Sequence, residues 1–331
     1  MPAGPEEGRG AMDLRQFWMT WRRDIVRGAV LFAVILTAGL TISNLAGRAR
    51  RGFNLNFDGP DAPELAGPAA PGDTAAVWTW TGKVAPKQSV WLKNVNGDVA
   101  VEPAAGDSVA VVVTKSGRRS QLRGVRLVAV PGDGVTICAL WGSGRNHCGV
   151  AGDYESGSLR RNSVRVQFTV RVPRGVKVDA FTVNGDVTIA GASAPIKAQT
   201  VNGAINAQTS AGPVEVKNVN GSVHAAISGF AEPGNVEVKT VNGAVTLELP
   251  AKLNAKLEAT TLAGSVDTDF PLTASQGILP RRFRGTVGTG GRTILVETLH
   301  GSIQVRKLAP QAPPAPKAPA RPAPAAPRAT S

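Results

Sequence analysis

The most constraining feature of the sequence is a nine-residue spacing of aliphatic residues. It holds without a break at Val187, Ile196, Ile205, Val214 and Val223. After an insertion at 229–233 it resumes in three further pairs, at Val236 and Val245, Leu257 and Val266, and Ile294 and Ile303. A period held over this length indicates a repeated structural unit that buries its apolar face by stacking on its neighbours.

Turn residues keep the same period. Asn-Gly pairs stand at Asn184-Gly185, Asn202-Gly203, Asn220-Gly221 and Asn242-Gly243, with one more upstream at Asn96-Gly97. Proline-containing segments lie midway between them, at 193–195, 211–213 and 233–235. Asn and Gly tolerate left-handed backbone angles, so each pair predicts a corner. Two half-units of nine residues therefore make one unit of about eighteen.

Apolar residues alternate with polar ones inside each half-unit, as in Val214-Glu215-Val216. Such alternation is typical of a strand with one buried and one solvated face. Two strands and two corners bring the chain back above its start, with coils stacked about 4.8 Å apart. The repeated Val-Asn-Gly is interpreted as scaffolding, in which Val packs inward and Asn-Gly turns the chain. Asparagines at the same corner are expected to hydrogen-bond to one another as a ladder.

The competing interpretation is an antiparallel meander of β-hairpins, because two-residue hairpin turns also favour Asn-Gly. A meander gives no reason for a nine-residue period with two alternating corner types, so the solenoid is favoured. Upstream, residues 76–180 contain longer apolar strands and a single Asn-Gly corner. They are predicted to form the first coils and a cap over an edge that would otherwise invite aggregation.

The phrases FTVRVPRGVKVDAFTVNGDVTIAG and GGRTILVETLHGSIQVRK, with the repeated corners between them, carry a family resemblance. The chain resembles the bacterial putative-adhesin β-strand-repeat family, named by analogy with auto-transporter adhesin heads, over residues 76–307. The resemblance implies an all-β, right-handed, single-stranded parallel β-helix in the cell envelope, and the family has no agreed activity. Asn is lost at the corners 261–264 and 298–301, where an asparagine ladder is expected to end.

Residues 29–46 carry no charge over 18 positions, which is just enough to cross a hydrocarbon layer as a helix. Trp18 and Trp21 lie where an interfacial aromatic belt is expected. Arginines are more numerous before this segment than after it, which favours a cytoplasmic N-terminus. Three alternatives are a buried helix, a cleaved signal peptide and a twin-arginine export signal at Arg22-Arg23.

These features divide the chain into five parts. They are a cytoplasmic segment (1–28), a transmembrane helix (29–46), a Pro/Ala/Gly linker (47–75), the β-solenoid (76–307) and a disordered, basic Pro/Ala-rich tail (308–331). The protein is thus predicted to be a single-pass protein of the bacterial inner membrane, with a periplasmic or extracellular ectodomain.

Cys138 and Cys148 are the two cysteines of the chain. In an exported segment they are predicted to form a disulfide, which stabilises such a loop by roughly 2–3 kcal/mol. Half of a metal site with His147 is the alternative, but it lacks a fourth ligand and zinc-finger spacing.

Two arginine clusters are candidate ligand-binding sites. The first contains Arg118, Arg119 and Arg123, with Arg126 beside them, and the second contains Arg281, Arg282 and Arg284. The second interrupts the nine-residue spacing and is therefore predicted to be a loop that bulges from the stack. Planar guanidinium groups suit phosphate and carboxylate, so the candidate partners are anionic envelope glycans or lipid head groups. No basic run is interleaved with aromatic residues, which argues against nucleic acid.

Catalytic, metal and cofactor sites are not predicted. Calcium-binding β-rolls place Asp in every turn, whereas only Asp98 and Asp186 follow an Asn-Gly corner here. Glu215 and Glu237, followed by Lys217 and Lys239, are interpreted as a solvated charge ladder. His147, His224 and His300 lie in no nucleophile motif.

The predicted function is a non-catalytic binding or structural module of the envelope. An envelope-stress signalling component is one alternative. A polysaccharide-active enzyme is another, and it requires a groove with converging carboxylates.

Overall fold

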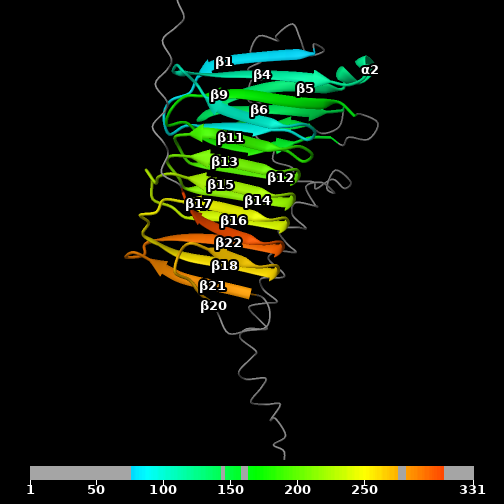
Figure 1. Cartoon of the computed structure of the whole chain (residues 1–331). Coiled ribbons are helices and arrows are strands. Elements are labelled where there is room, and N and C mark those ends of the chain that lie inside the picture. Colours follow the sequence, from blue (N-terminus) through cyan, green and yellow to red (C-terminus); the bar gives the residue numbers. More distant parts are fainter. Residues whose placement is uncertain (1–75, 143–145, 158–162, 275–280, 309–331) are drawn as a thin grey trace, which may run out of the picture.

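Most strands stack in parallel along one axis, as the computed structural model in Figure 1 shows. The structure describes residues 76–142, 146–157, 163–274 and 281–308. Within these ranges the strands form a ten-stranded sheet (sheet A), an eleven-stranded sheet (sheet B) and a small two-stranded sheet. Sheets A and B face each other across the core, because the inward side chains of both are buried.

Four regular coils occupy the middle of the stack, each with its first strand in sheet B and its second in sheet A. The coils are β10 (Lys177–Phe181) with β11 (Val187–Ala192), β12 (Ile196–Asn202) with β13 (Ile205–Thr209), β14 (Val214–Asn220) with β15 (Val223–Ile227), and β16 (Val236–Asn242) with β17 (Val245–Leu249). Neighbouring coils pair in parallel. The predicted parallel winding is therefore confirmed and the hairpin meander is wrong here, while the right-handed sense stays a prediction.

The nine-residue spacing places aliphatic side chains in vertical rows. Val178, Ile196, Val214 and Val236 lie in register on the inner face of sheet B and are buried. Each such side chain contributes roughly 1.5–3 kcal/mol by leaving water. A polar residue in one of these rows would face the apolar side chains of the coils on either side, which explains the strict period.

The last coils do not stack in sequence order. They are β18 (Ala255–Ala263) with β19 (Val266–Thr268), and β22 (Arg292–His300) with β23 (Ile303–Lys307). β22 lies between β16 and β18, and β23 lies between β17 and β19. The expectation that each coil stacks on the coil before it in the sequence is wrong at this end.

The reason lies in β21 (Arg281–Val287), which folds back antiparallel on β18 and carries the short β20 (Thr273–Ala274) on its far side. β21 covers the outer edge of β18. The next strand, β22, therefore pairs with the opposite edge of β18 and inserts between β18 and β16.

The N-terminal end shows a similar exchange of coils. β2 (Ser89–Lys93) and β3 (Val99–Pro103) stack directly on β10 and β11. The later pair, β6 (Gly134–Trp141) and β9 (Arg165–Val172), lies outside them.

Antiparallel strands then close this end of the stack. They are β1 (Val77–Lys83), β4 (Ser108–Ser116) and β5 (Val125–Gly132), with α2 (Arg119–Leu122) between β4 and β5. The prediction that residues 76–180 form first coils and a cap is confirmed. Figure 1 shows this cap at the end opposite to β20 and β21.

An excursion between β6 and β9 contains β7 (His147–Cys148), η2 (Val150–Gly152) and β8 (Tyr154–Glu155). The predicted disulfide between Cys138 and Cys148 is confirmed, with the two Cα atoms 6.0 Å apart. Tyr154 Oη donates a hydrogen bond of 2.6 Å to the Ala139 carbonyl. The excursion thereby covers the outer face of β6, which explains why residues 135–141 are all buried, unlike the alternating strands elsewhere.

Because the disulfide contains both cysteine sulfurs, neither is a thiolate that could bind a metal. The alternative of a metal site with His147 is therefore wrong. His147 Nε2 instead lies 2.9 Å from Asp153 Oδ2. In the described part of the chain, no helix is long and apolar enough to span a membrane. The transmembrane helix predicted at 29–46 lies outside the described residues, as do the cytoplasmic segment, the linker and all of the tail beyond residue 308.

Candidate functional site

The asparagines of the repeated corners form a ladder. Asn202 Nδ2 donates to Asn184 Oδ1 at 2.9 Å, Asn220 to Asn202 at 2.9 Å, and Asn242 to Asn220 at 3.0 Å. Next along the stack, His300 lies in register with Asn242. The predicted ladder and its predicted interruption are both confirmed.

The residue before Val, and not Val itself, points into the core. Thr182, Thr200 and Asn218 are buried, whereas the following valines are half-buried on the outer face. The prediction that this Val packs inward is therefore wrong. Every second residue of a strand points inward. Asn218 is therefore buried on the same side as Val214 and Val216.

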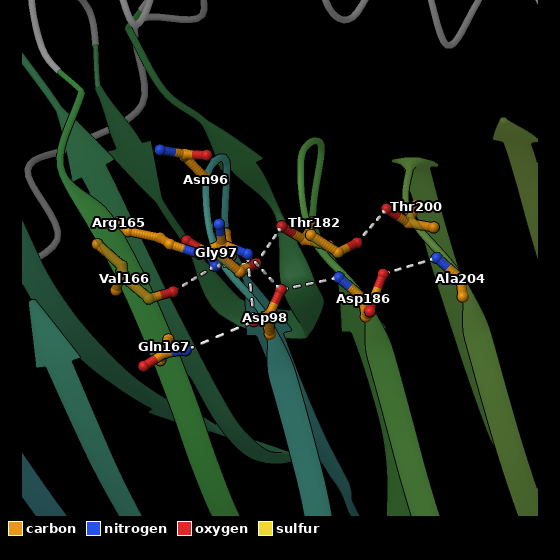
Figure 2. Close-up of polar contacts among 12 residues, drawn as sticks. Asn96, Gly97, Asp98, Arg165, Val166, Gln167, Thr182, Asp186, Thr200 and Ala204 are labelled. Carbon is orange, nitrogen blue, oxygen red and sulfur yellow. Dashed lines mark hydrogen bonds and ion pairs between the residues drawn. The ribbon is translucent and has the colours of Figure 1, made fainter. Parts of the chain in front are cut away.

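Each of these inward polar groups bonds to the corner of the neighbouring coil. Thr182 Oγ1 donates to the Gly97 carbonyl at 3.0 Å and Thr200 Oγ1 to the Gly185 carbonyl at 2.9 Å, and Figure 2 shows the first of these contacts. Asn218 Nδ2 reaches the Gly203 carbonyl at 3.0 Å. The buried corner carbonyls are thereby satisfied, as buried polar groups require.

The corner glycines are required by backbone angle and by space. Gly203 has φ +157°, and a Cβ there would lie 2.1 Å from the Gly185 carbonyl oxygen. Gly185 meets the Gly97 carbonyl oxygen in the same way, at 2.2 Å. A side chain at these positions would push the coils apart, so the repeated tripeptide serves the winding.

Asp98 and Asp186, which follow two of the corners, also bond across coils. Asp98 Oδ1 accepts from the Asp186 amide at 3.0 Å and from Arg165 Nη2 at 3.0 Å, and Asp186 Oδ1 accepts from the Ala204 amide at 2.8 Å (Figure 2). Burial raises the pKa of Asp98, but these hydrogen bonds and the Arg165 charge outweigh it and hold the pKa below its usual value. In the described ranges, no group of three potential ligands has a metal-site arrangement.

The second arginine cluster is not a loop. Arg281, Arg282 and Arg284 belong to β21, so the loop prediction is wrong. This segment breaks the nine-residue spacing because it pairs antiparallel with β18 instead of winding with the coils. Arg284 Nη2 lies 2.9 Å and Arg282 Nε 3.2 Å from Glu258 Oε1, and Arg281 donates to the Gly264 carbonyl. These guanidinium groups are already occupied by intramolecular contacts.

The first arginine cluster lies at the opposite end, on the cap. Arg118 and Arg123 flank α2 and Arg119 begins it, and all three side chains are exposed, as is Arg126 on β5. In the described part of the chain, no ion pair joins any of them to an acidic side chain. The structure therefore separates the two predicted clusters and leaves the cap arginines available.

The outer face of sheet B carries the predicted charge ladder. Glu215 lies in register with Glu237, and Lys217 with Lys239. Glu215 Oε1 is 2.6 Å from Lys217 Nζ and 3.4 Å from Lys197 Nζ. The ladder interpretation is confirmed.

These contacts also bear on the acidity of the ladder. Burial raises the pKa of Glu215, but the hydrogen bonds and charges of the two lysines outweigh it and keep the pKa below its usual value. Glu215 is therefore ionised at neutral pH and unsuited to donate a proton.

A shallow depression of about 350 Å³ on this face was missed by the sequence analysis. One row of its lining is Trp91, Asp179, Lys197, Glu215 and Glu237. We call this depression the sheet B trough. Strand alternation in the sequence identifies these residues as outward-facing. It does not show that they form one row until the coil order places β2 beside β10.

Comparison with known families identifies the fold. The family model described as Toastrack DUF4097 matches residues 83–306. The chain belongs to this family. The match confirms the resemblance expected from the repeated phrases, and it covers the Toastrack solenoid almost from end to end.

Two solved structures, both of putative adhesion proteins, are similar to this Toastrack chain. A putative cell adhesion protein from Clostridium sporogenes is 12% identical, with a TM-score of 0.44, over 70% of this chain and 100% of that one. A putative adhesin from Bacteroides fragilis is 13% identical, with a TM-score of 0.32, over 71% and 99% of the two chains. No match was found among curated proteins.

The corner geometry predicts that Gly203→Ala destabilises the Toastrack solenoid by roughly 3 kcal/mol, because the new Cβ meets a backbone carbonyl of the next coil. Urea unfolding of the full chain measures the free energy of unfolding. Gly106→Ala is the matched control, since a Cβ at Gly106 would have no heavy atom within 4 Å. Equal, small effects of the two substitutions would contradict the account of the corner.

Proposed function

We propose that this Toastrack chain is a non-catalytic binding module of the bacterial cell envelope. In this proposal, residues 29–46 anchor it in the cytoplasmic membrane and the solenoid lies outside. The disulfide between Cys138 and Cys148 supports an exported solenoid, because such bonds persist in oxidising compartments. The uncharged segment before the solenoid supports the anchor.

The observation that carries the proposal is the cap arginine cluster of Arg118, Arg119 and Arg123. These exposed side chains all belong to the short helix α2 or its two flanking positions and, in the described ranges, form no ion pair. Arginine binds phosphate and carboxylate through paired hydrogen bonds. The partner that fits is an anionic envelope polymer or lipid head group, and the cap is also the end at which the described chain begins.

Catalysis is the less favoured function. The sheet B trough contains Asp179, Glu215 and Glu237, but glycoside hydrolysis needs a carboxyl group whose pKa is raised. The pKa of Glu215 is lowered instead. A binding surface accounts better for carboxylates that are each held by a lysine.

Removing the cap arginines is expected to weaken binding of heparin, used as a model anionic glycan. Three exposed contacts of about 0.5 kcal/mol each predict a loss of about tenfold in affinity for the Arg118/Arg119/Arg123→Ala variant. Binding of the unchanged chain should also weaken as salt is raised. Titration calorimetry of the full chain in detergent measures both effects.

The matched control is Arg281/Arg282/Arg284→Ala, which removes the same charge from the other end of the solenoid. Because those arginines already contact Glu258 and the Gly264 carbonyl, we expect a much smaller effect on heparin affinity. Equal losses of heparin affinity in both variants would show that binding depends on net charge alone, and would reject the cap site.

The anchor predicts that the full chain stays with the membrane fraction after washing with high salt and alkali. A variant lacking residues 29–46 should be found in the soluble fraction, because the apolar segment that holds it is gone. Cell fractionation with mass determination of the mature N-terminus checks this. Full-length material in the soluble fraction, or a mature chain that begins after residue 46, would contradict the anchor.

A further inference from the structure

We propose that the sheet B trough binds a linear, uncharged polysaccharide, with Trp91 as the surface on which a sugar ring stacks. The inference rests on the proposed role as a binding module, but it concerns a different surface from the cap arginines. It assigns a second ligand class to the solenoid.

Trp91 is held in place at one end of the trough. It points outward from β2, and the excursion between β6 and β9 packs against it at Gly152. Gly152 has φ +77°, and a Cβ there would lie 2.5 Å from Trp91 Cδ1. The disulfide fixes this excursion to β6. The rest of the half-buried indole lines the trough, where an amphipathic ring can cover the apolar face of a sugar.

The trough is linear because it follows the register of the stack. Trp91, Asp179, Lys197, Glu215 and Glu237 occupy equivalent outward positions of five successive strands of sheet B. Four steps of about 4.8 Å give a row about 19 Å long, parallel to the solenoid axis. A chain of several sugar units fits a straight, shallow site of this length better than a compact ligand does.

Ion pairs within the sheet neutralise the charged lining. Asp179 Oδ1 lies 2.9 Å from Lys93 Nζ, and both side chains are largely buried. Glu215 contacts Lys197 and Lys217, and Glu237 contacts Lys239.

The surface therefore offers carboxylate acceptors and ammonium donors with little surplus charge. Sugar hydroxyl groups can donate hydrogen bonds to the carboxylates and accept them from the ammonium groups. A polyanion would gain little electrostatic attraction from a surface with so little net charge.

An extended peptide does not suit this surface. Peptides that extend a sheet bond to the free backbone groups of an edge strand. The trough runs across β2, β10, β12, β14 and β16, whose backbone groups are paired with neighbouring strands on both sides. Only side chains are available there, together with the rigid rings of Pro195 and Pro213. Side-chain contacts and a stacking platform are the means by which a glycan is held.

The test is titration of the full chain with chitohexaose, a linear uncharged oligosaccharide, followed by calorimetry. We expect binding that changes little between low and high salt. Trp91→Ala should weaken it about tenfold, because the stacking surface is lost. Trp91→Phe should retain part of the affinity, and thermal unfolding of each variant checks that it is folded.

His224→Ala is the matched control, since His224 is a half-buried outward residue of sheet A and lies outside the trough. It should bind chitohexaose like the unchanged chain. No binding of chitohexaose, or equal binding by folded Trp91→Ala, overturns the trough assignment. Heparin binding that persists in Trp91→Ala would leave the cap proposal standing, so the two failures are distinguishable.

Discussion

The contact between stacked corners is the constraint on which the rest of the structure depends. At five described corners a glycine carbonyl accepts a hydrogen bond from an inward Thr or Asn of the neighbouring coil, at a separation that leaves no space for a Cβ. The equivalent hydroxyl of Thr240 is buried without such a bond. The contact between corners fixes the register of both sheets at once. The apolar rows of the core, the asparagine ladder and the outer charge ladder all follow from it, because each is a set of equivalent positions in successive coils.

Both ends of the solenoid depart from simple winding, and the departures at the N-terminal end contribute to both candidate binding surfaces. At the N-terminal end, antiparallel strands and α2 form a cap that presents Arg118, Arg119 and Arg123. The excursion that follows β6 holds Trp91 at the start of the trough. At the other end, β21 covers the outer edge of β18 and β22 lies between β18 and β16. Arg282 and Arg284 of β21 contact Glu258, and Arg281 contacts the Gly264 carbonyl. The regular coils carry most of the sheet B trough, and the irregular N-terminal end supplies the cap arginines and the support for Trp91.

The sequence predicted those features that follow from local periodicity. The strands, the parallel register, the corners, the ladder and its end at His300 all come from spacings that can be counted. The inward position of Thr182 and Asn218 also follows from strand alternation, because every second residue of these strands points into the core. The insertion of β22 between β16 and β18 was not predictable in this way, because Val236, Leu257 and Ile294 share one register and suit either order. The trough depends on which coils are neighbours, so it became visible only with the coil order.

Disulfide trapping between coils most directly tests the central claim that the strands stack in parallel in the register and order described. Lys239, Glu297 and Thr260 lie in register on the outer face of sheet B, in the order β16, β22, β18. Cysteines replacing Lys239 and Glu297 should cross-link on mild oxidation, because adjacent strands bring Cα atoms within the range of about 4.4–6.8 Å that a disulfide spans. Cysteines replacing Lys239 and Thr260 should not, because a strand separates them. Cross-linking of the second pair and not the first would show sequential stacking and contradict the account.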